Sequence, residues 1–287
     1  MNRSAGWPRL VSAEVMKLRT TKAWWLFFGG FTVVSALATG LNCVGKHYAL
    51  YPQPGAFDRA QKLAAAAADR TPGGAAAIAA SLMTSGQALT VLFALLLGSY
   101  VVTSEYVNHT VTTTFLTVPR RERVIAAKLA AATSCGALFW LIATVVNAVV
   151  TPVFLSTQHL SVPLTAAAVT RSVALSLPAF ILWAAFGLGL GAVIRSQAVA
   201  IVVGLACFAG GFAAVAAISQ FAYNVVHQGW LFGARVIAPA VASQVMITSG
   251  RAFPHAPPQW VGAAVMAGYG LALTAAGVIQ TRRRDMT

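Results

Sequence analysis

Few residues of this chain have the chemistry for catalysis, and their spacing matches no catalytic or metal-binding pattern. Only 6 of the 287 residues are acidic, 5 are histidine and 3 are cysteine. No two histidines stand four residues apart, the spacing that places two metal ligands on one helix face. The serines and threonines lack a neighbouring base that would activate a hydroxyl for nucleophilic attack. We therefore expect no enzyme active site, and no cofactor or metal bound by this chain.

Two patterns that suggest a ligand fail on closer reading. Cys43, Cys135 and Cys207 each lie in an apolar run without a CxxC neighbour, which predicts small buried side chains rather than a disulfide or zinc site. Residues 40–46 match the first part of a phosphate loop, G-x-x-x-x-G-K, but His47 stands where a Mg²⁺-binding Ser or Thr belongs. No predicted strand precedes the pattern. ATP is therefore expected to bind elsewhere than on this chain.

The composition predicts a protein whose main solvent is lipid. The chain is 58% hydrophobic and 9% charged, whereas soluble domains are about 25% charged. Six long uncharged stretches each exceed the roughly 20 residues that a helix needs to cross the hydrocarbon core. Trimmed at turn signals, the expected spans are 24–44, 82–103, 129–151, 171–194, 198–218 and 260–281. Because a span in lipid must satisfy its own backbone hydrogen bonds, we expect an all-α integral membrane protein with six transmembrane helices, forming a single domain over 1–287.

The basic residues set the expected orientation. The net charge is +14, but Lys and Arg stand in short clusters at the edges of apolar runs, where anionic headgroups attract them. A nucleic-acid site would instead gather them on one polar face. With both termini inside, the inner segments hold 13 of the 20 Lys and Arg residues, and the much longer outer segments hold 7. The positive-inside rule then predicts cytoplasmic termini, with the lipid bilayer and not nucleic acid as the partner.

The N-terminal segment 1–22 is predicted to contain a helix, over 8–22, that lies on the inner membrane surface. Its apolar residues share one side of the helix and most of its basic residues lie opposite. Glu14 breaks this pattern because it falls on the apolar side. Two interpretations stay open: a carboxylate at headgroup level near Lys17, or a contact with another protein.

Two outer segments have unusual compositions. Residues 45–80 are rich in alanine with scattered charges, which predicts an exposed helix outside the membrane, flanked by proline-containing turns. Residues 219–258 are too apolar for an ordinary outer loop and include Pro239. We expect two short re-entrant helices there, dipping into the outer leaflet with their broken backbone sheltered by protein.

The inner segment 104–124 is the most informative part of the sequence. A plain connection between two spans needs only a few residues, whereas this one has about 20. It mixes β-branched, aromatic and basic residues, and Pro119 is compatible with the first turn of a helix. The segment is either an interfacial helix held by arginine and headgroups, or a docking element for a cytoplasmic partner.

Three patterns resemble one family of membrane proteins. They are Glu105-Tyr106…Thr110…Leu116…Pro119-Arg120-Arg121…Arg123…Lys128 in the inner loop, Glu14-x-x-Lys17-Leu18 before the first span, and Gly187-x-Gly189-x-Gly191…Arg195-Ser196…Ala200 across the fourth and fifth spans. In order and spacing, this arrangement resembles the membrane (permease) subunits of bacterial type-2 ATP-binding-cassette exporters. The resemblance covers most of the chain.

The resemblance implies a division of labour between subunits. The inner loop would be a coupling helix seated in a groove of a separate ATPase subunit, which binds ATP and Mg²⁺. The docking residues implied are Glu105, Tyr106, Thr110, Leu116, Pro119, Arg120, Arg121 and Arg123, with Glu14 and Lys17 of the N-terminal helix. A second permease subunit, identical or different, would complete the substrate path. The protein would then lie in the bacterial cytoplasmic (inner) membrane.

Isolated polar and aromatic residues within the spans are candidates for that substrate path. They are Asn42, Trp140, Asn147 and Trp183. Anchoring at the membrane interface and packing between helices explain the same residues equally well. A glycine run over 187–191 similarly predicts a smooth face for close helix approach, with or without motion.

A self-contained secondary carrier or channel is the alternative function. Carriers often show two similar halves, and no internal repeat is evident here. Proton and ion relays use Asp, Glu or His within spans, and the predicted spans hold none of these well inside their length.

The charge asymmetry predicts the sidedness of the chain. Reporter fusions after Thr287 and within 59–70 should report opposite sides of the membrane, with the C-terminus in the cytoplasm. A result that places both reporters on the same side would contradict the six-span topology.

Overall fold

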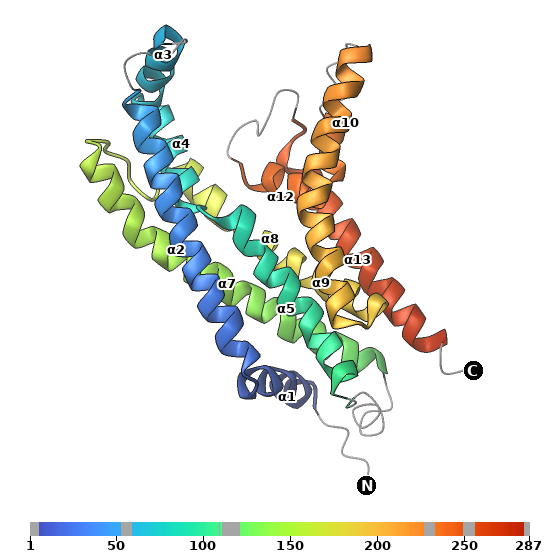
Figure 1. The fold of residues 1–287 in the computed structure, drawn as a ribbon. Helices are drawn as coiled ribbons and strands as arrows, with labels where there is room; N and C mark the ends of the chain where they lie inside the picture. Colours follow the sequence, from blue (N-terminus) through green and yellow to red (C-terminus); the bar gives the residue numbers. More distant parts are fainter. Residues whose placement is uncertain are drawn as a thin grey trace.

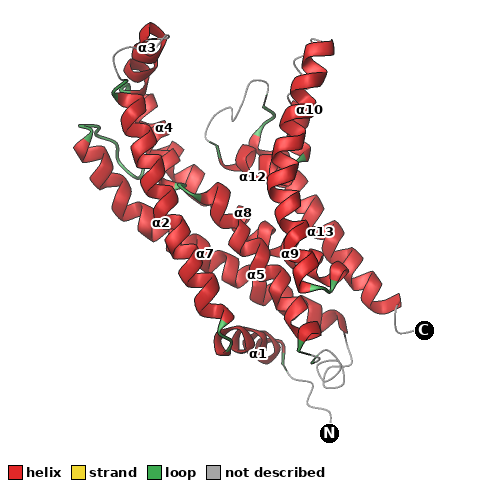
Figure 2. Ribbon diagram, in the orientation of Figure 1, coloured by secondary structure: helices red, strands yellow, loops and turns green. Residues whose placement is uncertain are grey.

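The described part of the structure consists of helices joined by short turns. The computed structural model describes residues 6–52, 59–108, 110, 121–226, 233–248 and 256–283. Six of its helical segments are long and apolar enough to cross a membrane. Figure 2 shows helices and loops, and no strand, in this part of the chain. The prediction of an all-α integral membrane protein with six spans is confirmed.

The helices follow the predicted spans and extend most of them. The first three are α1 (Trp7–Thr20), α2 (Ala23–Leu50) and α3 (Arg59–Asp69). The central group is α4 (Pro72–Met83), α5 (Gln87–Val107), α7 (Arg121–Thr157) and α8 (Ala167–Ile194). The remainder is α9 (Gln197–Leu205), η1 (Ala206–Gly210), α10 (Gly211–Val226), η2 (Ala234–Ile237), α12 (Pro239–Ile247) and α13 (Gln259–Arg283). Of the segment 219–258, the structure describes the end of α10 and the short helices η2 and α12.

The first helix lies across the base of the bundle. Figure 1 shows α1 running crosswise to α2 and the other spanning helices. Pro8 stands in its first turn, where a missing backbone donor costs nothing. Its buried residues are Glu14 and Leu18, while Trp7 of the apolar side is about half exposed. The helix therefore packs on the protein through a face that includes its one carboxylate.

The closest contact in the bundle joins α5 to α8 through glycine. A Cβ added at Gly187 would overlap the backbone carbonyl of Leu95, and one added at Gly191 would lie 2.7 Å from the carbonyl oxygen of Ser99. Gly189 faces the other side, where an added Cβ would lie 2.7 Å from Leu273 in α13. The predicted close approach along the glycine run is thus present on two faces of α8.

The second span is broken, which the sequence did not predict. We expected an outer loop up to residue 80 and one helix over 82–103. The structure instead has α4, begun by Pro72 with Thr71 as its N-cap, a turn over 84–86, and then α5. Gly86 makes this turn possible because its φ of +73° is unfavourable for other residues. The residues 72–80 therefore form a partly buried helix, whereas α3 is the exposed helix predicted for this segment.

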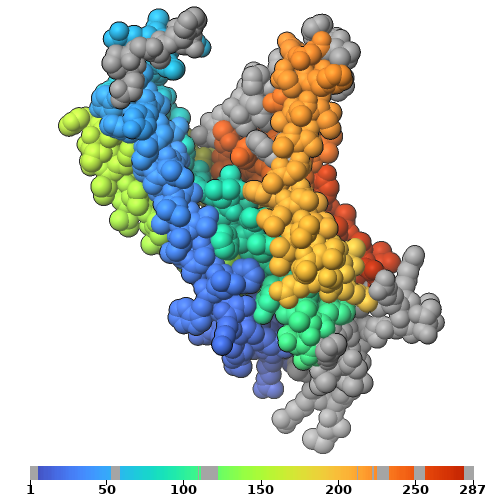
Figure 3. Space-filling model, in the orientation of Figure 1, coloured from blue at the N-terminus to red at the C-terminus, as the bar shows by residue number. Residues whose placement is uncertain are grey.

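The fifth span changes helix type part-way along. The segment η1 is a π-helix between α9 and α10, an element often found at functional sites. Few residues of α2 and of α9 to α10 are buried. Figure 3 shows a hollow between α2 and α10 at the end of the molecule remote from α1. The core of the bundle lies deeper, around Phe31, Phe139 and Trp183.

The α5–α8 contact predicts a large effect for a single methyl group. Gly187→Ala should destabilise the protein by about 1–3 kcal/mol, because the two backbones must separate to admit the Cβ. Gly40→Ala is the matched control, since Gly40 has no atom near its Cβ position. The control should be neutral or slightly stabilising, as alanine favours helix. Thermal unfolding of the purified protein in detergent measures both, and equal melting temperatures for the two variants would contradict this packing.

Candidate functional site

Four charged side chains from three helices meet at the end of the bundle next to α1. Lys128 of α7 lies 2.8 Å from Oε2 of Glu14 in α1, and 2.8 Å from Oε1 of Glu105 in α5. Lys17 of α1 lies 2.7 Å from Glu14 and 2.8 Å from the same oxygen of Glu105. Positive and negative groups alternate around this ring. We call these four residues the charge cluster.

Burial makes the charge cluster sensitive to loss of any member. The Lys128 side chain is 5% exposed, and those of Glu14 and Glu105 are 9% and 10% exposed. Lys17 stays 49% exposed. A buried charge without its partner costs several kcal/mol, whereas a complete set of pairs offsets that penalty. The cluster therefore joins α1, α5 and α7 as long as all of its charges are present.

The local sequence explains how the cluster forms. Glu14 and Leu18 lie on the same face of α1, and Lys17 reaches back to Glu14 over three residues. Burial opposes the charge on Lys17, but hydrogen bonds to Glu105 and Glu14 outweigh it and hold the pKa of Lys17 above its usual value. The carboxylate that broke the apolar pattern of α1 thus faces oppositely charged groups of its own chain. The expected proximity of Glu14 to Lys17 is present, and the ion pair between Glu14 and Lys128 is a contact that neither interpretation included.

Lys128 is the member that sequence reasoning left without a role. Its ammonium also lies 3.4 Å from the carbonyl oxygen of Val101. Glu105 is the first charged residue after the second predicted span, and Lys128 is the last charged residue before the third. Both residues were therefore expected at the same membrane surface, a signal that could have paired them.

The structure describes three of the other predicted docking residues. Tyr106 lies under the guanidinium of Arg195, with 5.3 Å from Cζ to the ring centroid, so the α8–α9 turn is tied to the end of α5. Thr110 donates its backbone N–H to the carbonyl of Glu105, and Arg123 is exposed near the start of α7. Leu116, Pro119 and Arg120 lie outside the described residues, as does the side chain of Arg121. The docking role of all these residues stays a prediction.

A cavity of about 410 Å³ lies beside the charge cluster. Its walls include Lys17 and Thr20 of α1 and Ser104, Glu105 and Asn108 of α5. The cavity adjoins the point where the chain leaves α5 for the inner loop. A partner that contacts this loop would therefore lie next to the cluster.

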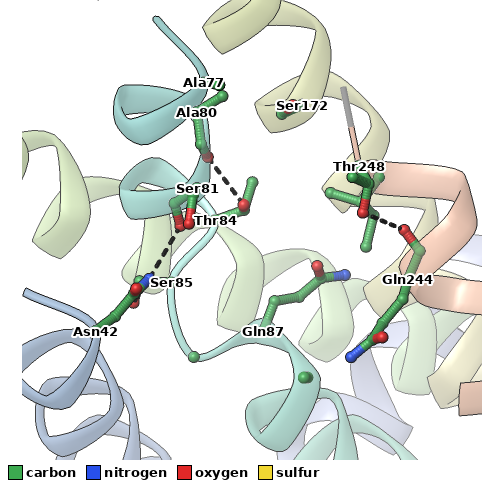
Figure 4. A pocket seen from close by; sticks show the side chains of 13 residues that line it. Asn42, Ala77, Ala80, Ser81, Thr84, Ser85, Gln87, Ser172, Gln244 and Thr248 are labelled. Carbon is green, nitrogen blue, oxygen red and sulfur yellow. Dashed lines mark hydrogen bonds between the residues drawn. The ribbon is translucent and has the colours of Figure 1, made fainter. Parts of the chain in front are cut away.

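Two of the four substrate-path candidates line cavities at the opposite end of the bundle. Asn42 lies on the wall of a cavity of about 460 Å³ between α2, α4, α8 and α12 (Figure 4). Trp183 lies on the wall of a second cavity, of about 290 Å³. Asn42 also donates a hydrogen bond of 3.0 Å to Ser85 Oγ in the turn between α4 and α5.

The other two candidates hold helices together. Asn147 of α7 is buried, donates to the carbonyl oxygens of Met83 and Ser85, and accepts from Thr39. It therefore fixes the turn between α4 and α5. Trp140 donates its ring N–H to Ser176 Oγ at 2.9 Å in α8. Neither residue lines the two cavities, so packing accounts for both.

Among the described residues, no group of three His, Cys, Asp or Glu side chains is placed to hold a metal ion. The three cysteines are free thiols. The described part thus has a charge cluster at one end of the bundle and two cavities with polar but uncharged linings at the other.

Comparison with known families decides the identification. The model of the family described as ABC-2 family transporter protein matches residues 10–211. The chain belongs to this family. The match begins within α1 and ends at the start of α10, so it includes the whole charge cluster and the glycine run of α8. A search of curated proteins found no match.

Membership of the ABC-2 family confirms the resemblance recognised in the sequence. The chain is a multi-pass membrane protein and an ABC transporter permease, a transport component that is generally not catalytic itself. Membrane subunits of this family generally work with ATPase partners. The secondary carrier is not favoured.

The charge cluster predicts a specific weakness in this ABC-2 permease. Lys128→Met should lower stability by about 3–5 kcal/mol, because Glu14 and Glu105 would face each other in a buried site with only the half-exposed Lys17 between them. Release of α1 should follow, seen as faster proteolysis within residues 7–20. Lys22→Met, which removes the same charge from an exposed position, is the control. If both variants melt and digest alike, the cluster does not hold α1.

Proposed function

We propose that this chain is the permease subunit of an ATP-driven exporter in the bacterial inner membrane. It forms the substrate path, its termini are cytoplasmic, and a separate cytoplasmic subunit binds ATP with Mg²⁺ and hydrolyses it. A second permease subunit completes the path. The exposed apolar faces of α2 and α10, which include Phe221, are available to lipid and to that second subunit.

The charge cluster is the observation that carries this proposal. The inner loop follows the end of α5 at Val107, two residues after Glu105, and ends at Arg121, two helical turns before Lys128. Glu105 and Lys128 form an ion pair 2.8 Å long. A force that a partner applies to the loop therefore acts on α5 and α7 together. Lys17 and Glu14 add α1 to the same unit. Such a connection through the charge cluster suits a subunit whose conformation is changed by an ATPase.

Helix α5 offers a route from this connection to the far end of the bundle. It runs without a break from Gln87, on the wall of both remote cavities, to Glu105 in the charge cluster. A helix of this length spans about 30 Å. Its contact with α8 is backbone to backbone at Gly187 and Gly191, so the two helices are expected to move as one unit.

In this proposal the predicted docking residues divide into two groups. Glu14, Lys17 and Glu105 act from within the chain, by fixing the position of the loop. The surface that the ATPase contacts comes from Tyr106, Thr110, Leu116, Pro119, Arg120, Arg121 and Arg123. Their basic charge suits acidic groups of a partner.

The docking surface is tested with Arg120→Ala combined with Arg121→Ala. Loss of one partner of a buried interfacial charge pair usually costs about 2–5 kcal/mol. The double variant should therefore retain far less ATPase in co-purification and lose ATP-dependent transport, at unchanged abundance in the membrane. The matched control is Arg59→Ala with Lys62→Ala, which removes two exposed basic residues of α3 at the other end of the molecule.

Two results would contradict the proposed function. In the first, the Arg120 and Arg121 double variant retains as much ATPase in co-purification, and transports as well, as the control variant. The other is ATP hydrolysis by a pure sample of this chain without a partner.

A further inference from the structure

The two remote cavities are neighbours within a single subunit. Four residues line both of them: Gln87 and Ala88 of α5, and Gln244 and Ile247 of α12. The cavities of about 460 and 290 Å³ are in the range of pockets that hold small organic ligands. The site lies where α4 and α5 are interrupted by the turn at Gly86, which leaves space beside the first turn of α5.

Two buried hydrogen-bond donors in this site lack a partner in the protein. Gln87 is 8% exposed and Trp183 is fully buried, yet neither Gln87 Nε2 nor Trp183 Nε1 has a hydrogen-bond acceptor. Figure 4 shows the Gln87 side chain reaching into the cavity from the start of α5. A buried polar group without a partner destabilises the state that contains it. Gln87 and Trp183 both line the smaller cavity.

The remaining lining determines the kind of molecule that fits. Among the described residues that line the two cavities, none is charged. Val91, Phe208 and Ala240 make one part of the wall apolar, while Ser81, Ser85 and Thr84 make another part polar. A charged ligand would meet no countercharge here, and a pure hydrocarbon would leave both donors unsatisfied.

The helix around Phe208 has the irregular geometry often found at ligand sites. Phe208 and Ala209 belong to the π-helical segment η1, and both line the smaller cavity. The Phe208 ring lies 5.5 Å from that of Trp183 between centroids. The π-segment thus places an aromatic wall next to one of the two unpartnered donors.

We propose that this site binds an uncharged amphipathic molecule through acceptor oxygens, such as those of an ester, amide or hydroxyl group. The acceptors take the N–H groups of Gln87 and Trp183, and the apolar part lies against Val91 and Phe208. That this ligand is also the exported substrate rests on the proposed function. The binding itself does not, because it requires neither ATP nor a partner.

A photoreactive monoacylglycerol tests the proposal on the purified full-length chain. The probe carries a diazirine on its alkyl chain, and two comparison probes carry the same chain with a trimethylammonium head or with no head group. Only the monoacylglycerol should label residues of α5, α12 or η1 at saturable sites. If added phospholipid abolishes the labelling seen in detergent, the natural ligand is a bilayer lipid. If the labelling persists in phospholipid nanodiscs, the natural ligand is a solute.

Two substitutions remove the donors at similar side-chain size. Gln87→Met and Trp183→Phe should each weaken labelling by the monoacylglycerol about two- to tenfold, the effect of one neutral hydrogen bond. Gln220→Met on α10 and Trp25→Phe on α2 are the matched controls, since both residues are exposed and neither lines the cavities. Gln87→Met should not lower the melting temperature of the ligand-free protein, because no protein hydrogen bond is lost.

Equal labelling by the headless probe, or wild-type affinity in both Gln87→Met and Trp183→Phe, would overturn the proposal. So would a lower melting temperature of ligand-free Gln87→Met, since Gln87 would then serve the fold. Labelling as expected without ATP-dependent transport of the same compound would contradict only its role as exported substrate.

Discussion

The attachment of α1 to the spanning helices depends on a ring of four alternating charges, three of which are buried. Lys128 has almost no access to solvent and lies between Glu14 of α1 and Glu105 of α5, which are far apart in the sequence. Each charge is tolerable in this position only because the others are present. The surface helix α1 is thereby attached to the spanning helices by electrostatics as well as by packing of Leu18.

The two ends of the molecule have complementary properties that α5 connects. At the end near α1, charges fix α5 to its neighbours beside the inner loop. At the other end, the same helix begins with Gln87. Gln87 lies in a site that is polar and uncharged, and some hydrogen-bond donors there have no acceptor in the protein. Between the two, glycines let α5 and α8 touch along their backbones. Rigid contact in the middle, with polar groups at both ends, is what a helix needs to transmit a displacement.

The spans could be predicted from sequence because the charges limit where a chain can enter lipid. The break at Gly86 could not, although the 34-residue length of the uncharged stretch 71–104 exceeds what one span requires. Glu14 was recognisable as an exception on an apolar face. Its partner Lys128 lies 114 residues away, and only the folded chain brings them together. Trp183 was a candidate from sequence as an isolated aromatic residue within a span, whereas Gln87 was not, and the missing partners of both donors are visible only in the folded chain.

The central claim is that the charge cluster fixes α1 to the spanning helices while the transporter works. Spin labels at Ser12→Cys in α1 and Ser134→Cys in α7, with the three native cysteines replaced, report the distance between these helices. The account predicts one narrow distance distribution, unchanged between the nucleotide-free and nucleotide-trapped complexes, which broadens when Lys128→Met is added. A broad distribution in the protein with an intact cluster, or one that Lys128→Met leaves unchanged, would contradict it.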